Sequence, residues 1–176
     1  QEAEILTKLP GFKGYLQDVG GPTANMYGYE CTKKLSRGAC TDRRCVFPMP
    51  CTALRPTHQP QIELLQSLRN VPGVKKVFVG SGIRYDLILN DRRFGAHYLE
   101  EIVENHVSGQ LKVAPEHTEP DILKLMGKPG MENLVKFKEK FDTLNKISGK
   151  KQFLSYYFIA AYPGCDEKDM QSVKKF

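Results

Sequence analysis

The sequence predicts an α/β protein in which parallel strands alternate with helices. Apolar runs typical of buried strands are separated by segments whose apolar residues recur every three or four positions, which is the helical period. The runs end in glycines or in polar and charged residues, and α/β proteins bind ligands at the carboxyl ends of parallel strands. The expected strands span about 15–21, 75–80, 109–114 and 152–161.

The segments between these strands carry helix signals. Pro60 suits the first turn of a helix over about 59–70, and Val71-Pro72-Gly73 ends it. A stripe of Leu99, Ile102, Val103 and His106 marks a helix over about 96–105. The remaining expected helices are a short one capped at Thr118 with Pro120 in its first turn, a long one over about 131–147, and one after Cys165.

Four strand-helix units make only part of a TIM-type barrel, because a closed barrel of eight units takes about 250 residues. We therefore expect residues 1–176 to form a partial barrel domain with helical crossovers. A cysteine-bearing insertion occupies about 28–58, where Pro48, Pro50 and Pro56 exclude a long helix. The chain begins without Met and stops within an expected helix, so we expect a fragment of a longer protein.

Composition excludes a membrane protein and a disordered chain. The 176 residues are 40% hydrophobic and 26% charged, and no apolar stretch approaches the roughly 20 residues of a membrane-spanning helix. The first residues lack the basic and apolar regions of a signal peptide. We expect a cytoplasmic protein whose five cysteines are ligands, catalysts or core residues rather than disulfides.

Four of the cysteines lie within 21 residues, in the spacing C-x8-C-x4-C-x5-C. They are Cys31, Cys40, Cys45 and Cys51. Four thiolates on loops of this length suit one tetrahedral centre, either zinc or an iron-sulfur cluster. The spacing is not the common C-x2-C pair, so a partial site completed by an external ligand and a set of free thiols stay open as alternatives.

The same region is rich in basic residues, and the whole chain has a net charge of +6. These residues are Lys33, Lys34, Arg37, Arg43, Arg44 and Arg55. They indicate either a phosphate-binding surface or an ordinary solvated one.

Candidate binding residues follow each of the first three strands. Gly20, Gly21 and the run Gly80-Ser81-Gly82 let the backbone approach a ligand closely, and Arg84 offers a fork for a carboxylate or phosphate. Lys112, on the same strand face as Ala114, suits anion binding or Schiff-base chemistry, or else lies exposed at an edge.

Two further candidates end the third strand. Glu116 suits contact with a ribose or an amino group, and His117 suits proton transfer. Either residue is equally well explained as a loop residue that caps the following helix.

Several ordered phrases together resemble YgiQ-like radical SAM proteins, over nearly the whole chain. The phrases are residues 18–27 (DVGGPTANMY), the four-cysteine box, residues 72–78 (PGVKKVF), 81–86 (SGIRYD), 106–117 (HVSGQLKVAPEH), and 157–159 with 163–164. The resemblance implies a partial barrel in which a 4Fe-4S cluster and S-adenosylmethionine meet at the strand ends. Reductive cleavage of the cofactor then yields a 5'-deoxyadenosyl radical, with an electron from flavodoxin or ferredoxin.

The resemblance also places residues. The CxxxCxxC cluster loop of such proteins is absent here, so the fragment itself is expected to be inactive. Gly20-Gly21-Pro22 stands where many radical SAM enzymes have Gly-Gly-Glu, which removes the usual contact to the methionyl amine. Ser81 and Arg84 are implied to face the methionyl carboxylate and Lys112 and Glu116 the ribose or substrate, while residues 159–164 meet the adenine.

Two other functions compete with this one. A lyase that forms a Schiff base on Lys112 would be trapped by borohydride in the presence of a carbonyl substrate. An RNA-binding module folded around zinc at the cysteine box would bind in a salt-dependent way and lose binding on chelation or on substitution of Arg43 and Arg44. RNA could also be the substrate of the radical enzyme itself.

Overall fold

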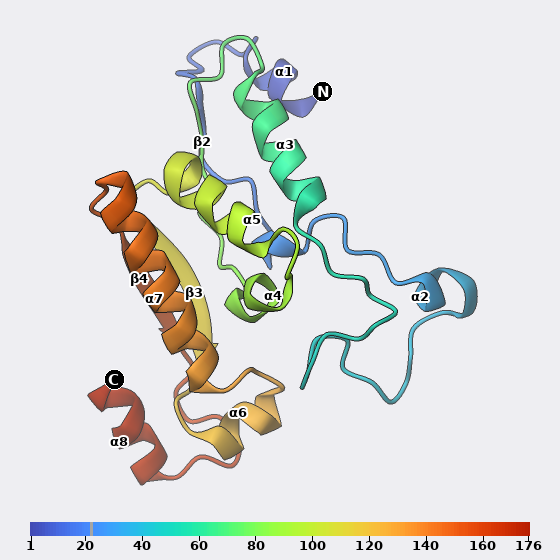
Figure 1. Cartoon of the computed structure of the whole chain (residues 1–176), viewed down its shortest axis with the longest axis vertical. Coiled ribbons are helices and arrows are strands. Elements are labelled where there is room, and N and C mark those ends of the chain that lie inside the picture. Colours follow the sequence, from blue (N-terminus) through green and yellow to red (C-terminus); the bar gives the residue numbers. More distant parts are fainter. Residues whose placement is uncertain (22) are drawn as a thin grey trace.

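Short parallel strands form the framework of the computed structural model, which describes residues 1–21 and 23–176. The strands are β1 (Tyr15–Leu16), β2 (Lys76–Val77), β3 (Gln110–Glu116) and β4 (Phe153–Phe158). β1 pairs with β2 and β3 pairs with β4, both in parallel. Ile83, downstream of β2, makes a parallel bridge to Val113 of β3. The parallel pairing therefore follows chain order (Figure 1).

Helical segments connect these strands. They are α1 (Glu2–Leu6), η1 (Ala24–Met26), α2 (Thr32–Arg37), α3 (Gln59–Arg69), α4 (Tyr85–Asn90), α5 (Gly95–Glu101), η2 (Ile102–His106), α6 (Pro120–Met126), α7 (Met131–Ser148) and α8 (Glu167–Lys175). Proline in the first turn begins α3 and α6, as expected. Gly127 and Gly149 end α6 and α7 in the left-handed conformation, at φ 69° and 65°, which glycine adopts without steric cost.

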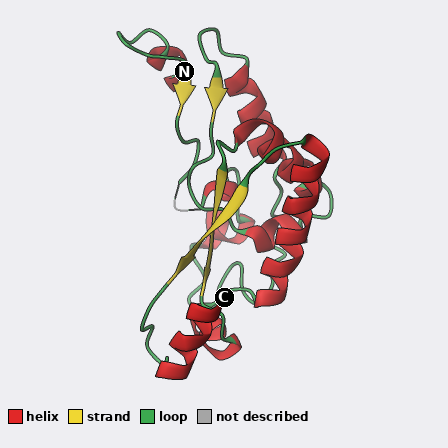
Figure 2. Ribbon diagram, turned by 90° about the vertical axis from the view of Figure 1, so that its left-hand side faces the viewer, coloured by secondary structure: helices red, strands yellow, loops and turns green. Residues whose placement is uncertain are grey.

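One face of the strands packs on helices and the other is half-open. Leu111 and Val113 of β3 are buried in a core with Phe137 and Phe141 of α7, whereas Lys112 points to the opposite face and is only partly buried. Successive strand residues alternate between faces, so Ala114 and Glu116 share the face of Lys112. Figure 2 shows the central helices gathered on one side of the strands.

The predicted strands lie at the right places, and three of them are longer than the observed ones, whereas β3 continues two residues past the predicted end at 114. β1 ends at Leu16, where 15–21 was predicted, and the pairing beyond it is irregular. The N–H of Val19 donates to the Phe78 carbonyl, and the side chain of Asp18 bonds the backbone of Gly80 and Ser81. The predicted helix over 96–105 changes into a wider helical turn after Glu101. Its apolar stripe, ending in His106, is fully buried as predicted. α1, α2 and α4 had not been predicted.

The cysteine-rich segment, residues 28–58, contains only the six-residue helix α2, in agreement with its prolines. Residues 32–45 are all exposed, and Figure 1 shows α2 and the chain around it extending to one side of the molecule. Over the described part of the chain, no helix has the length and apolar character needed to cross a bilayer.

Candidate functional site

A carboxylate at the end of β1 joins the ends of the first two strands. Asp18 Oδ1 accepts hydrogen bonds from the backbone N–H groups of Gly80 (2.8 Å) and Ser81 (3.1 Å), and its Oδ2 accepts one from Ser81 Oγ. Gly20 lies against the same serine, since a Cβ built on Gly20 would come within 2.6 Å of Ser81 Cβ. Gly20 and Ser81, two of the predicted binding residues, are thus neighbours, and Asp18 contacts both of them.

Asp18 remains ionised in this setting. Partial burial alone would raise its pKa, but the hydrogen bonds from Ser81 and Gly80 and the positive charge of Lys112 together bring the pKa below its usual value. Lys112 therefore acts on Asp18 from the third strand. A negative charge with a lysine nearby marks the open face at these strand ends.

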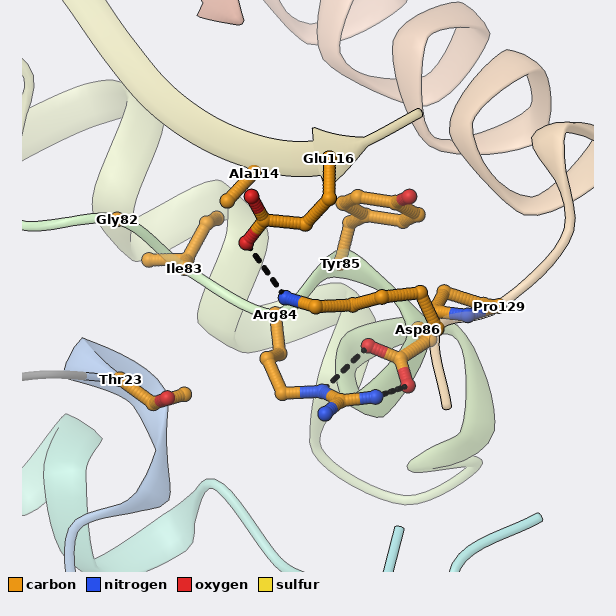
Figure 3. Close-up of a pocket in the computed structure, with 10 residues that line it drawn as sticks. Thr23, Gly82, Ile83, Arg84, Tyr85, Asp86, Ala114, Glu116 and Pro129 are labelled. Carbon is orange, nitrogen blue, oxygen red and sulfur yellow. Dashed lines mark hydrogen bonds and ion pairs between the residues drawn. The ribbon is translucent and has the colours of Figure 1, made fainter. Parts of the chain in front are cut away.

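Arg84, at the start of α4, directs its side chain into a small cavity (Figure 3). Its Nε and Nη2 donate to the two carboxylate oxygens of Asp86, at 3.1 and 2.7 Å, in a bidentate pair. The Asp86 side chain is only 7% exposed, so the pair is held away from bulk water. Nη1 of Arg84 makes no hydrogen bond to the described residues, which leaves a donor for a ligand.

A second ion pair borders the same cavity. Lys128 Nζ lies 2.9 Å from Glu116 Oε1, and both side chains are mostly buried. Glu116 has φ 72°, an unfavourable conformation for a residue with a side chain, at a shift in the register between β3 and β4. Such strain is typical of functional sites. The cavity measures about 80 Å³, room for a carboxylate or ammonium group but much less than the several hundred cubic ångströms of a nucleoside pocket.

The structure brings most of the predicted binding residues to one side of the strands. Gly20 and Ser81 meet at the ends of β1 and β2, Arg84 and Glu116 line one cavity, and Lys112 lies on the face between these groups. Gly21 differs, because a Cβ built there meets nothing within 4 Å. Pro22, predicted to replace the usual glutamate, lies outside the described residues.

The four cysteines do not converge in this structure. Cys40 and Cys45 are exposed and Cys31 and Cys51 partly buried, and all are free thiols. Among residues 1–21 and 23–176, no three histidine, cysteine or acidic side chains are close enough to hold a metal ion together. The backbone N–H of Cys51 does donate to the carbonyl of Cys45 at 2.8 Å, so these two positions are adjacent.

His117 at the end of β3 is fully buried and bonded on both sides. Its Nδ1 accepts the backbone N–H of Glu119 at 3.0 Å, which leaves the proton of the neutral ring on Nε2. Nε2 lies 3.5 Å from Cys165 Sγ. His117 therefore caps the turn before α6, one of the two roles weighed for it, and donates to a thiol far away in the sequence.

Residues that sequence reasoning missed complete the site. Asp18 is a charged residue just before the glycine pair 20–21 that ends the first predicted strand, and that position was a signal that could have found it. Asp86 lies two residues after Arg84, and this spacing could also have suggested an ion pair between them. Lys128, Asn25 and His58 carry no local signal, because their partners are distant in the sequence.

The fold and this site define an α/β protein of parallel strand-helix units with a polar site at the strand ends. Its relatives are UPF0313 proteins. The chain is 54% identical over all 176 residues to one from Fusobacterium nucleatum, of which it covers 31%. It is 46% identical over 176 residues to one from Methanosarcina mazei and 49% identical over 169 residues to one from Methanocella arvoryzae, covering 28% of each.

The chain thus spans less than a third of the length of these curated relatives. No protein-family model matches it. No solved structure matches it either.

Proposed function

We propose that this chain is part of a radical S-adenosylmethionine enzyme and binds that cofactor on the half-open face of its strands. The sequence resembles YgiQ-like radical SAM proteins over nearly its whole length. The observation that carries the proposal is that Arg84 and Glu116, on separate elements, line one strand-end cavity. Gly82, the neighbour of Ser81 in the sequence, and Ala114, on the strand face of Lys112, line it too. Ligands of α/β proteins bind in this location.

The charges suit the amino-acid end of the cofactor. Nη1 of Arg84 would donate to the methionyl carboxylate, and Lys112 and Glu116 would hold the ribose or the substrate. Ser81 would face the carboxylate only on releasing the hydroxyl hydrogen bond that it donates to Asp18. The cavity of about 80 Å³ accommodates only the methionyl end, so the nucleoside would lie on the open face beyond it. The glycine at position 20 allows the backbone after β1 to approach Ser81 closely, which brings the two strand ends together at this face.

A 4Fe-4S cluster, reduced by flavodoxin or ferredoxin, would supply the electron that cleaves the carbon–sulfur bond of the cofactor. The cysteines in this chain do not fit that cluster, because their spacing is C-x8-C-x4-C-x5-C and no three of them come together in the described residues. The role of residues 1–176 is therefore to bind and orient S-adenosylmethionine.

The test uses the full-length protein that contains this chain, purified without oxygen and loaded with iron and sulfide. With dithionite and S-adenosylmethionine, it should form 5'-deoxyadenosine, detected by liquid chromatography and mass spectrometry. Arg84→Met should reduce this product strongly at limiting cofactor. A fully loaded protein that forms no 5'-deoxyadenosine under reducing conditions would overturn the proposal.

The cysteine box is proposed to hold a separate metal, either zinc or a second iron-sulfur cluster. Four thiols on an exposed segment have the donor chemistry for either, and closing the loops around an ion would bring them together. Zinc, iron and acid-labile sulfide are measured on anaerobic protein and on a Cys40→Ser/Cys45→Ser variant. Loss of one metal equivalent in the variant is expected, and equal metal content in both proteins would contradict the assignment.

The distribution of charge favours RNA as a second candidate ligand. Six basic residues and two acidic residues, Glu30 and Asp42, fall within residues 28–58, so this segment carries +4 of the net charge of +6. Most of these side chains are exposed on the projecting segment. RNA binding should weaken steeply with salt and weaken again in an Arg43→Ala/Arg44→Ala variant. Binding that is unchanged in the variant would argue against an RNA surface here.

The Schiff-base lyase stays a third candidate. Lys112 is partly buried on the open face, where a carbonyl substrate would find it. Borohydride trapping with carbonyl compounds should label this lysine if the lyase exists, and an unlabelled protein would exclude it.

A further inference from the structure

A buried chain of polar side chains leads from the base of the cysteine-rich segment to Arg84. Asn25 lies just before the segment and His58 is its last residue, and both are almost completely inaccessible to solvent. Asn25 Nδ2 lies 3.1 Å from His58 Nε2, and His58 Nδ1 lies 2.9 Å from Asp91 Oδ2. None of these three residues lines the cavity.

The direction of every hydrogen bond in this chain is fixed. Burial alone would raise the pKa of Asp91, but hydrogen bonds from Phe94 and His58 hold it below the usual value, so the carboxylate only accepts. His58 Nδ1 must therefore donate. Burial lowers the pKa of His58, and the hydrogen bond and negative charge of Asp91 raise it only in part, so the pKa stays below the ordinary value. The ring is therefore neutral, and its Nε2 accepts a hydrogen bond from Asn25.

This polarity decides how the amide of Asn25 is turned. With Nδ2 facing His58, the same Nδ2 donates to the Arg84 carbonyl at 2.9 Å and Oδ1 accepts from the Arg84 N–H at 2.7 Å. Asn25 thereby satisfies both backbone groups of Arg84, as a neighbouring strand would. Reversing the amide would break both bonds, because donor would face donor and acceptor would face acceptor.

The chain also fastens the two ends of the cysteine-rich segment to each other. Tyr29, near its beginning, places its hydroxyl 3.4 Å from His58 Nε2, and the two rings meet edge to face with centroids 5.9 Å apart. The backbone N–H of His58 adds a further bond to Asp91 Oδ2 at 2.8 Å. The position of Arg84 thus depends on how the segment is anchored.

We propose that Asn25, His58 and Asp91 are positioning residues that hold Arg84 at the cavity, so that the anchoring of the cysteine-rich segment controls ligand binding there. The inference rests on the proposed function for the role of Arg84 as a ligand contact. The hydrogen-bond relay itself is independent of which ligand binds.

Two substitutions of His58 separate its two bonds. His58→Gln retains a hydrogen-bond acceptor, the side-chain amide oxygen, near the position of Nε2, where it faces Asn25. His58→Asn instead retains a donor, the side-chain NH₂ group, near the position of Nδ1, where it faces Asp91. Asn25→Asp keeps the shape of the side chain but removes the donor to Arg84. Asn145→Asp is the matched control, since Asn145 is also buried and hydrogen-bonded but lies at the end of α7.

Hydrogen exchange is measured by mass spectrometry on a peptide covering residues 82–87 in the full-length protein. Exchange should rise about tenfold in His58→Asn and Asn25→Asp, the effect of losing about one hydrogen bond next to Arg84. It should rise by less in His58→Gln, which keeps the bond to Asn25 but loses the Nδ1 bond to Asp91, and stay near the original rate in Asn145→Asp. Denaturation curves identify any variant that is globally unfolded. Equal exchange in all folded variants would overturn the relay.

Affinity for S-adenosylmethionine, measured by titration calorimetry on the same proteins, gives the second readout. It should fall about tenfold in His58→Asn and Asn25→Asp and remain unchanged in Asn145→Asp. If the original protein binds no S-adenosylmethionine, the proposed function fails while the exchange data still decide the relay. If exchange rises but affinity does not change, Arg84 is held by the relay but does not control binding, and the proposal is wrong.

Discussion

Asn25 satisfies both backbone hydrogen-bonding groups of Arg84, 59 positions away in the sequence, through Oδ1 at 2.7 Å and Nδ2 at 2.9 Å. This contact ties the loop after β1 to the start of α4. It explains how a short irregular stretch between Gly80 and Tyr85 presents a charged side chain at a defined position. Neither residue belongs to a strand, so the side-chain amide of Asn25 makes the two backbone hydrogen bonds that a neighbouring strand would otherwise make.

Gly20 and Gly21 should respond differently to substitution by alanine. A Cβ on Gly20 would approach Ser81 Cβ to 2.6 Å, so Gly20→Ala must displace Ser81, in the loop after β2, at an expected cost of about 1–3 kcal/mol. Gly21→Ala meets nothing within 4 Å and should change stability by less than about 0.5 kcal/mol. Urea unfolding of both variants checks this, and equal stabilities would contradict the observed contact.

Arg84 and Lys128 are the two positively charged residues at the cavity, and removing their charges should lower the free energy of unfolding by different amounts. Arg84→Met leaves the carboxylate of Asp86, 7% exposed, without its bidentate partner, and should lower the free energy of unfolding by about 2–4 kcal/mol. Lys128→Met breaks a pair that water reaches more easily and should cost about 1 kcal/mol or less. Chemical denaturation measures both, and a larger loss for Lys128→Met would show that the order is wrong.

Acid should destabilise the protein through His58. Burial puts the pKa of folded His58 below the ordinary value of about 6.5, so below that pH the unfolded state binds a proton that the folded state does not. The free energy of unfolding therefore falls as the pH drops from about 6.5 towards the folded pKa. His58→Gln removes this titration and should flatten the profile.

Urea unfolding at several pH values measures the effect. His97→Gln is the control, because the His97 side chain is 55% exposed, and it should keep the original slope. A His58→Gln protein with the same slope as the original would mean that another group causes the pH dependence.

The sequence was a good guide where structure depends on local patterns. The apolar stripe ending in His106 is buried as predicted, because a helical period specifies one face. Phe137 and Phe141 of the helix predicted over 131–147 are buried as well. The positions of the strands were found from their apolar runs, which are typical of buried parallel strands. The carboxyl ends of three strands were overestimated, since apolar and glycine residues continue past the last ladder partner, whereas β3 continues to Glu116, past its predicted end at 114.

The site could be predicted only in part. Residues at strand ends, such as Ser81 and Glu116, were found because chain topology fixes which strand ends lie together. Pairs that join distant segments, such as Lys128 with Glu116, depend on loop conformations that no local pattern encodes. The barrel and the metal at the cysteine box stay predictions.

The central claim is that the strand-end face around Arg84 holds S-adenosylmethionine. The most direct measurement is titration of S-adenosylmethionine into the full-length, cluster-loaded protein, its Arg84→Met variant, and an Arg37→Met control on the exposed helix α2. We predict binding to the original and control proteins and at least about tenfold weaker binding to Arg84→Met, as expected for losing a charged hydrogen bond. Equal affinity in all three proteins, or no binding to any, would contradict the account.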